Sequence, residues 1–168
     1  MMTPPNELPN WLPNIVPLSN YAGDWNKYID AIYALFETDF INTQPFFNGR
    51  RVGHKKDPTL NGKADTFWHV ISTGPSETER IPDMRRCERI RWPRPIIENQ
   101  SADCILVWPN RRGNDDRICL WFKNLEYIVV LADRGTYLLL WTAYVVDRPH
   151  QKRKFQKEFD DYQSTKNG

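Results

Sequence analysis

Apolar residues recur at intervals of three and four positions between residues 25 and 36. This spacing predicts an amphipathic helix that begins after Asp24, a residue suited to N-capping, and ends near Asp39. Upstream of it, five of the 13 prolines fall within residues 4–17, a density that excludes helix and central strand. We therefore expect residues 1–20 to form a Pro-rich arm that packs on its own domain, which is the favoured alternative, or on a partner.

The middle of the chain contains two short predicted elements. Residues 66–72 (TFWHVIS) are rich in aromatic and β-branched side chains. They predict a strand with Phe67, His69 and Ile71 on one face. Residues 80–92 predict a short helix, which the prolines that follow would stop.

The last third of the chain alternates between apolar runs and short turn-like links. The four apolar runs are residues 104–108, 118–122, 126–132 and 136–146. Links as short as these favour an antiparallel meander. The charged residues from Arg148 onward predict a closing helix, with Phe155, Phe159 and Tyr162 as its apolar edge. These patterns predict a single α+β domain over residues 21–168, in which N-terminal helices pack on a four- to five-stranded antiparallel sheet with a C-terminal helix.

Composition limits the function classes without selecting one. Hydrophobic residues make up 40% and charged residues 26%, as in globular proteins, and the net charge of +2 does not by itself indicate nucleic-acid binding. The three cysteines have no paired spacing, and no apolar run follows the first residues, so we expect a cytoplasmic protein with free thiols. No apolar stretch is long enough to predict a membrane span. Metal-binding, phosphate-loop and nucleophile-elbow motifs do not occur, so we predict no metal and no cofactor.

Positive charge is concentrated in two stretches. Residues 42–64 form a basic segment interrupted by glycine and proline, which is either a solvated loop or a loop that faces phosphate groups. The second stretch is rich in arginine, which clamps phosphates through paired donors but also occurs on solvated helices with weak ion pairs. Its arginines are Arg80, Arg85, Arg86, Arg89, Arg91 and Arg94.

Two polar features interrupt apolar strands. His69 lies inside a predicted strand. Histidine is a residue type suited to general acid or base chemistry, although a satisfied core position is the alternative. In the last strand, alternation places Leu138, Leu140, Thr142 and Tyr144 on one face. The hydroxyls of Thr142 and Tyr144 are either a candidate site or a reflection of strand propensity.

This combination resembles the superfamily that unites barnase, the EndoU nucleases, colicins E5 and D, and the RelE toxins. An early segment from Lys63 to His69, the arginine-rich middle and the late hairpin EYIVVLADRGTYLLLWTAY carry the resemblance over about residues 60–146. The chain is most similar to the colicin D-like and phage-encoded branches. The resemblance implies a toxin-like, metal-independent endoribonuclease, in which a 2′-hydroxyl of RNA attacks the adjacent phosphate.

The resemblance also implies roles for individual residues. His69 would be the general acid or base, and Thr142 and Tyr144 would bind and position the phosphate. Arg89 or Arg134 would offset the charge that develops on the phosphate. The residues expected to contact the substrate are Lys63, Ser72, Arg85, Arg86 and Arg134.

The resemblance makes RNA the expected partner, with tRNA as one candidate. It also makes an immunity or antitoxin protein a candidate protein partner. Two alternatives remain open. The chain is a non-catalytic phage or mobile-element module that binds nucleic acid or a host protein, or it is a protein-binding domain that uses its Pro-rich arm and exposed aromatic residues.

Overall fold

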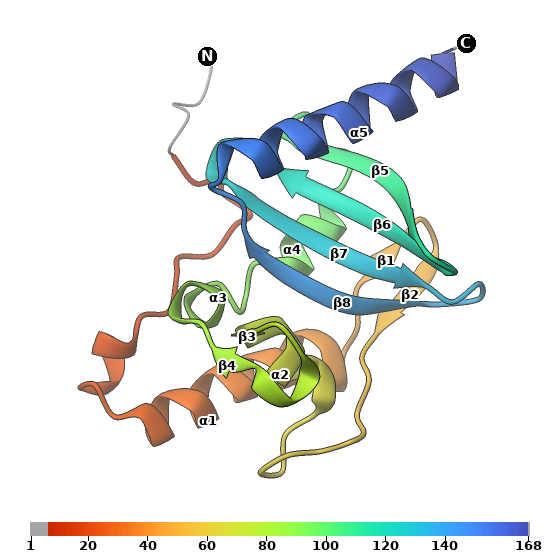
Figure 1. Cartoon of the computed structure of the whole chain (residues 1–168). Coiled ribbons are helices and arrows are strands. Elements are labelled where there is room, and N and C mark those ends of the chain that lie inside the picture. Colours follow the sequence, from red (N-terminus) through yellow and green to blue (C-terminus); the bar gives the residue numbers. More distant parts are fainter. Residues whose placement is uncertain (1–6, 168) are drawn as a thin grey trace.

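A computed structural model describes residues 7–167, in which a six-stranded mixed sheet lies between two groups of helices (Figure 1). The helices are α1 (Trp25–Phe36), α2 (Asp65–Ile71), α3 (Met84–Glu88), α4 (Pro93–Glu98) and α5 (Pro149–Asn167). The sheet strands are β1 (Phe46–Phe47), β2 (Arg50–Gly53), β5 (Ile105–Arg112), β6 (Asp115–Phe122), β7 (Tyr127–Asp133) and β8 (Leu138–Val145). A separate hairpin consists of β3 (Ser72–Thr73) and β4 (Ile81–Pro82).

The sheet has the strand order β1-β2-β8-β7-β6-β5. The predicted antiparallel meander is confirmed for β5 to β8. The predicted strand number and the all-antiparallel sheet are wrong, because β2 pairs with β8 in parallel through Val52 and Gly53. Both β1 and β2 fall within the segment predicted to be a loop. These strands are two and four residues long, so they carry too little alternation to be recognised.

Residues 66–72 are the second correction, since residues 65–71 form helix α2 rather than a strand. Short apolar runs do not distinguish the two structures by periodicity alone. In the helix Phe67 and Ile71 are one turn apart and fully buried in the core. His69 therefore does not share their face, as the strand prediction required, but lies on the half-buried side of the helix beside Trp68.

The arginine-rich segment contains two short helices rather than one. The Asp83 carboxylate caps α3 by accepting from the backbone N–H of Arg85 (2.8 Å) and Arg86 (3.3 Å). Pro93 does not stop a helix but begins α4, at the first position where proline is tolerated because the N–H it lacks has no partner within a helix.

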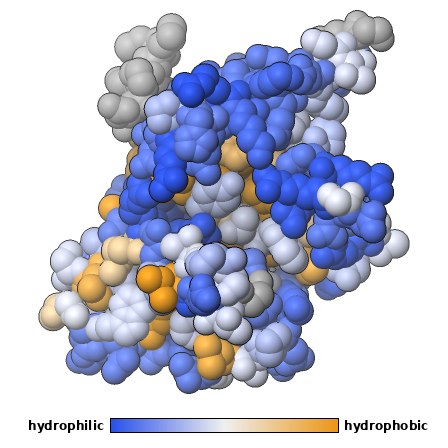
Figure 2. Space-filling view, in the orientation of Figure 1, coloured by the Kyte–Doolittle hydropathy of each residue, from blue (hydrophilic) through white to orange (hydrophobic). Residues whose placement is uncertain are grey.

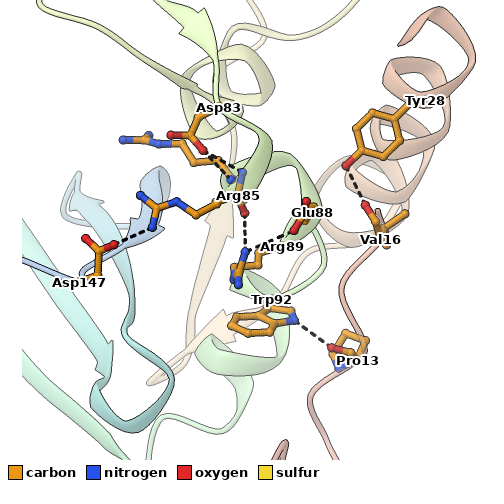
Figure 3. A network of polar contacts seen from close by, with 10 residues as sticks. Pro13, Val16, Tyr28, Asp83, Arg85, Glu88, Arg89, Trp92 and Asp147 are labelled. Atoms are coloured by element: carbon orange, nitrogen blue, oxygen red, sulfur yellow. Dashed lines mark hydrogen bonds and ion pairs between the residues drawn. The ribbon is translucent and has the colours of Figure 1, made fainter. Parts of the chain in front are cut away.

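The N-terminal arm packs on its own domain from residue 7 onward, while residues 1–6 of the predicted arm lie outside the described residues. Leu12 is 5% exposed, and the Trp92 indole N–H donates to the Pro13 carbonyl at 2.9 Å (Figure 3). The Tyr28 hydroxyl donates to the Val16 carbonyl at 2.7 Å. The arm is therefore part of the core on the side of α1 to α4, and the expectation of packing on its own domain is confirmed.

The two faces of the sheet have separate cores. One core includes α1 to α4 and the arm. The other lies under α5, on the opposite side of the sheet in Figure 1, and includes Trp108, Trp121, Val130 and Phe155. Helix α5 packs mainly against β5, at the far edge of the sheet from β1. The α5 helix therefore covers only part of the face on which it packs.

A bulge in β8 overturns the predicted alternation. Thr142 pairs with Val130, whereas Leu140 pairs with Leu131, so Trp141 is an extra residue in β8. Leu140 consequently packs in the core on the side of α1 to α4, while Thr142 lies opposite Val130 on the α5 side. Leu138 stays with Leu140, and Tyr144 stays with Thr142, so the predicted common face of these four residues does not exist.

Candidate functional site

The part of the α5-side face that α5 leaves uncovered is basic and aromatic. We call this part of the surface the open face. Figure 2 shows a hollow beside α5 in which apolar surface is bordered by hydrophilic residues. It lies along β8, whose edge beyond Leu139 is flanked by α2 and α3. The open face consists of Arg117, Trp141, Thr142 and Tyr144 from the sheet, Arg134 from the turn between β7 and β8, and Arg86 from α3.

Trp141 stands at the centre of this surface. The guanidinium carbons of Arg117 and Arg134 lie 5.1 and 5.9 Å from the centre of its ring. The His69 ring lies 5.4 Å away, on the side of α2. Asp115 forms ion pairs of 3.5 Å with Arg117 and 3.7 Å with Arg134 and so balances part of their charge. The bulge is what turns the half-buried Trp141 ring toward these cations.

Arg86 contacts both Thr142 and Tyr144. Its Nη1 donates to the Thr142 Oγ1 at 3.2 Å, and its guanidinium lies 5.1 Å from the centre of the Tyr144 ring. Burial, and then the nearby charge of Arg80, lower the pKa of Arg86, and burial raises the pKa of Tyr144. Among the side chains that the structure describes, no carboxylate forms an ion pair with Arg86. The charge of Asp83 acts against the lowering of this pKa but does not reverse it, so the guanidinium is a partly desolvated cation whose charge is only partly balanced, which favours binding of an anion.

His69 lines two cavities. The Trp141 cavity, of about 420 Å³, is lined by His69, Trp141, Leu140 and Thr66 among others. The Trp68 cavity, of about 500 Å³, also has His69 in its lining. Its lining residues include Leu60, Asn61, Asp65, Trp68, Ser72 and Arg80.

Arg80 forms hydrogen bonds with the backbone at the end of α2. Its Nη2 donates to the His69 carbonyl at 2.8 Å and also to the Ser72 carbonyl. Ser72, which the resemblance implies as a substrate contact, is 4% exposed and begins β3. Arg80 thereby connects the end of α2 to the β3–β4 hairpin, and it sets the position of His69 through the backbone.

We expect Gly74→Ala to destabilise the β3–β4 hairpin. A Cβ at Gly74 would lie 2.4 Å from the Glu79 carbonyl oxygen and 2.8 Å from the Arg80 Cα, so the backbone must shift. The expected loss in the free energy of unfolding is about 1–3 kcal/mol, measured by urea denaturation. Gly53→Ala is the control, because its Cβ meets its nearest neighbour at 3.9 Å. Equal losses in the two variants would contradict the steric explanation.

Arg85 lies near the open face but faces a third cavity. It pairs with Asp147 at 2.7 Å, and this contact raises the pKa of Arg85 and lowers that of Asp147 (Figure 3). The third cavity has a volume of about 440 Å³ and is lined by Arg85, Arg86, Tyr144 and Arg148 among others. Arg85 therefore lies close to the position at which Arg86 could bind an anion. The charge of Arg85 is already paired with Asp147.

Two of the implied site residues lie elsewhere. The Arg89 guanidinium is 5.1 Å from the centre of the Trp92 ring, and it contacts Glu88 and the Arg85 carbonyl (Figure 3). Lys63 pairs with Asp30 on α1 at 2.7 Å. Neither contacts the open face among the described residues. The implied residues that the structure does place on or beside the open face are His69, Arg86, Arg134, Thr142 and Tyr144.

The sequence did not single out Arg117 as a site residue, and it placed Trp141, one of five tryptophans expected to be able to stack on bases, on the wrong face of β8. Alternation assigned Trp141 to the face opposite Thr142, because nothing in the sequence marks the bulge between them. Arg117 lies between the segment predicted to be a turn, which ends at Asp116, and the strand predicted from Ile118, whereas β6 begins at Asp115. The position of Arg117 directly before the apolar run of β6 is the signal that could have extended that strand.

Within residues 7–167, no three or more His, Cys, Asp or Glu side chains are grouped so that they could hold a metal ion. The helices in this range include none that is long and apolar enough to cross a membrane. Cys87, Cys104 and Cys119 are free thiols. Comparison of the chain with protein-family models, curated proteins and solved structures finds no match.

Proposed function

We propose that the chain is a metal-independent endoribonuclease whose open face binds RNA beside His69. One observation carries the proposal. Two sets of contacts lie along the same strand, β8: His69 from α2 contacts Trp141, and Arg86 from α3 contacts Thr142 and Tyr144. This arrangement combines a proton-transfer group, a cation suited to phosphate and an aromatic face suited to an unpaired base.

The proposed reaction is transfer of the phosphodiester within RNA. The 2′-oxygen loses its proton and forms a bond to the neighbouring phosphorus, while the bond from phosphorus to the 5′-oxygen breaks and that oxygen gains a proton. The products are a 2′,3′-cyclic phosphate and a 5′-hydroxyl end. His69 carries one of these protons, and Arg86 stabilises the charge that develops on the phosphate oxygens.

Arg86 takes the part that the resemblance implied for Arg89. Arg86 already donates to Thr142, and a phosphate on the open face can replace or share that contact. Arg134 remains a candidate for a neighbouring phosphate, because its guanidinium lies 5.9 Å from the centre of the same indole that His69 contacts. The resemblance to the barnase, EndoU, colicin and RelE superfamily supports this arrangement, with Arg86 in place of Arg89.

The proposal is tested by incubating the protein with single-stranded RNA and with tRNA in the presence of EDTA. We expect cleavage that leaves 2′,3′-cyclic phosphate ends, because no step requires a metal ion. His69→Ala should lower the cleavage rate by about 10²-fold or more. The matched control is His150→Ala, since His150 is an exposed histidine near the start of α5.

Two outcomes would contradict the proposal in different ways. Equal rates for His69→Ala and the unsubstituted chain would remove His69 from the mechanism. Binding of RNA without cleavage would instead support the alternative of a non-catalytic module that binds nucleic acid. The salt dependence of that binding would then show whether phosphate contacts carry the affinity.

A further inference from the structure

The Trp68 cavity is the strongest feature that the proposed function leaves unused. It has a volume of about 500 Å³, within the range of small-molecule sites in proteins. It shares Pro58, Asp65 and His69 with the Trp141 cavity, so the two cavities are neighbours. Each of them is lined by one indole, Trp68 in one and Trp141 in the other.

We propose that the Trp68 cavity binds the nucleobase on one side of the cleaved phosphate, while Trp141 stacks on the nucleobase on the other side. This inference rests on the proposed function and adds the substrate class to it. The substrate is RNA that is unpaired at two consecutive nucleotides, because each base must leave its helix to enter its own cavity.

The chemistry of the cavity walls fits a nucleobase. The Trp68 indole N–H donates to the Leu60 carbonyl at 3.0 Å, which fixes the ring in one orientation and leaves its face for stacking. Leu60 is 57% exposed and adds apolar surface at the same cavity. Asn61 and Thr78 bring an amide and a hydroxyl, which can bond to the polar edge of a base.

Charge favours a nucleotide over a peptide at this position. Arg80 lines the Trp68 cavity and Arg86 stands beyond it, close enough for the charge of Arg80 to lower the pKa of Arg86. A phosphodiester between the two bases would lie near both cations and beside His69. An apolar protein segment would leave these charges without an anion, which costs free energy.

The experiment measures binding of RNA oligonucleotides that carry a single 2′-deoxy nucleotide at the cleavage position, so that binding is read without cleavage. Trp68→Ala should weaken binding roughly tenfold, the usual contribution of one stacked base. Removing one base, by an abasic nucleotide beside that position, should weaken binding by the same factor. Combining the variant with the abasic RNA should give no further loss, because both changes remove the same contact.

One further variant is a control, and another is a second test of the cavity. Trp25→Ala removes an indole that is 37% exposed on α1 and should leave the dissociation constant unchanged. Leu60→Ala alters only an exposed side chain of the cavity and should weaken binding two- to threefold without affecting the fold. It keeps the proposal testable should Trp68→Ala fail to fold.

Independent losses for Trp68→Ala and for the abasic RNA on either side of the phosphate would overturn the inference. Unchanged RNA binding in Trp68→Ala and Leu60→Ala would do the same and would leave the cavity to a protein partner. Failure of the proposed function is a separate result. In that case RNA carrying every 2′-hydroxyl stays intact, while the binding pattern of the variants still supports or refutes the base cavity.

Discussion

Arg86→Met is expected to reduce RNA cleavage by about 10²–10³-fold while leaving the fold as stable as before, or more stable. The loss of activity follows from the position of the guanidinium, which bonds to Thr142 and lies over Tyr144 at the proposed phosphate position. Methionine has a similar length and an apolar side chain, so it fills the space of the arginine without offering a donor to the phosphate.

The stability expectation follows from the lowered pKa of Arg86. The folded chain holds this proton less firmly than the unfolded chain does, because burial and the charge of Arg80 disfavour the cation. The charged guanidinium therefore opposes folding at every pH below its lowered pKa, which includes the whole neutral range. Methionine removes this cost. We expect the free energy of unfolding to change by about 0 to +1 kcal/mol.

Arg89→Met is the matched comparison for both measurements. Arg89 packs on Trp92, contacts Glu88 and lies away from the open face. Its removal should leave cleavage within a few-fold of the unsubstituted chain and should lower stability, because Glu88 loses a partner. Cleavage rates and urea denaturation measure the two effects. Full activity in Arg86→Met, or loss of activity in Arg89→Met alone, would contradict the assignment of Arg86 as the phosphate cation.

Trp108→Ala is expected to lower the free energy of unfolding by about 3–5 kcal/mol. Trp108 is 1% exposed, and its ring centre lies 5.9 Å from that of Phe155 and 6.2 Å from that of Phe159 on α5. Its indole N–H also donates to the Glu158 carboxylate at 3.0 Å. The substitution therefore removes both the packing and the hydrogen bond that hold α5 on the sheet.

The loosening of α5 can be observed directly. Trypsin should cleave within the lysine- and arginine-rich first half of α5 in Trp108→Ala faster than in the unsubstituted chain. Trp25→Ala is the control for urea denaturation, since its exposed indole should contribute about 1 kcal/mol or less. A loss for Trp108→Ala as small as for this control would mean that α5 is not anchored through Trp108.

The elements that could be predicted are those with long periodic patterns. The helix after Asp24 was evident because its buried residues recur over three turns, and Asp24 does cap it by accepting from the Lys27 N–H at 3.1 Å. The meander of β5 to β8 was evident because the links between these strands are short, and strands joined by a short link pair with each other. The closing helix was expected from Arg148 onward, and α5 begins at Pro149.

The candidate site was predictable only as a set of residues, not as an arrangement. The structure brings Arg86 into contact with Thr142 and Tyr144, and His69 into contact with the neighbouring Trp141. Nothing in the sequence distinguishes Arg86 from Arg89 as the arginine that contacts Thr142. Arg86 and Arg89 are three residues apart in sequence, and only the short α3 turn decides which of them points toward β8.

By itself, the sequence determined the helix after Asp24, the meander of β5 to β8 and the closing helix, because these elements carry long periodic patterns or short links. The tertiary structure decided what depends on distant partners. Residues 65–71 form helix α2 and pack on other elements, and β2 pairs with β8 across about half of the chain. The bulge at Trp141 then set which side chains of β8 meet His69, since one extra residue reverses the faces of a strand.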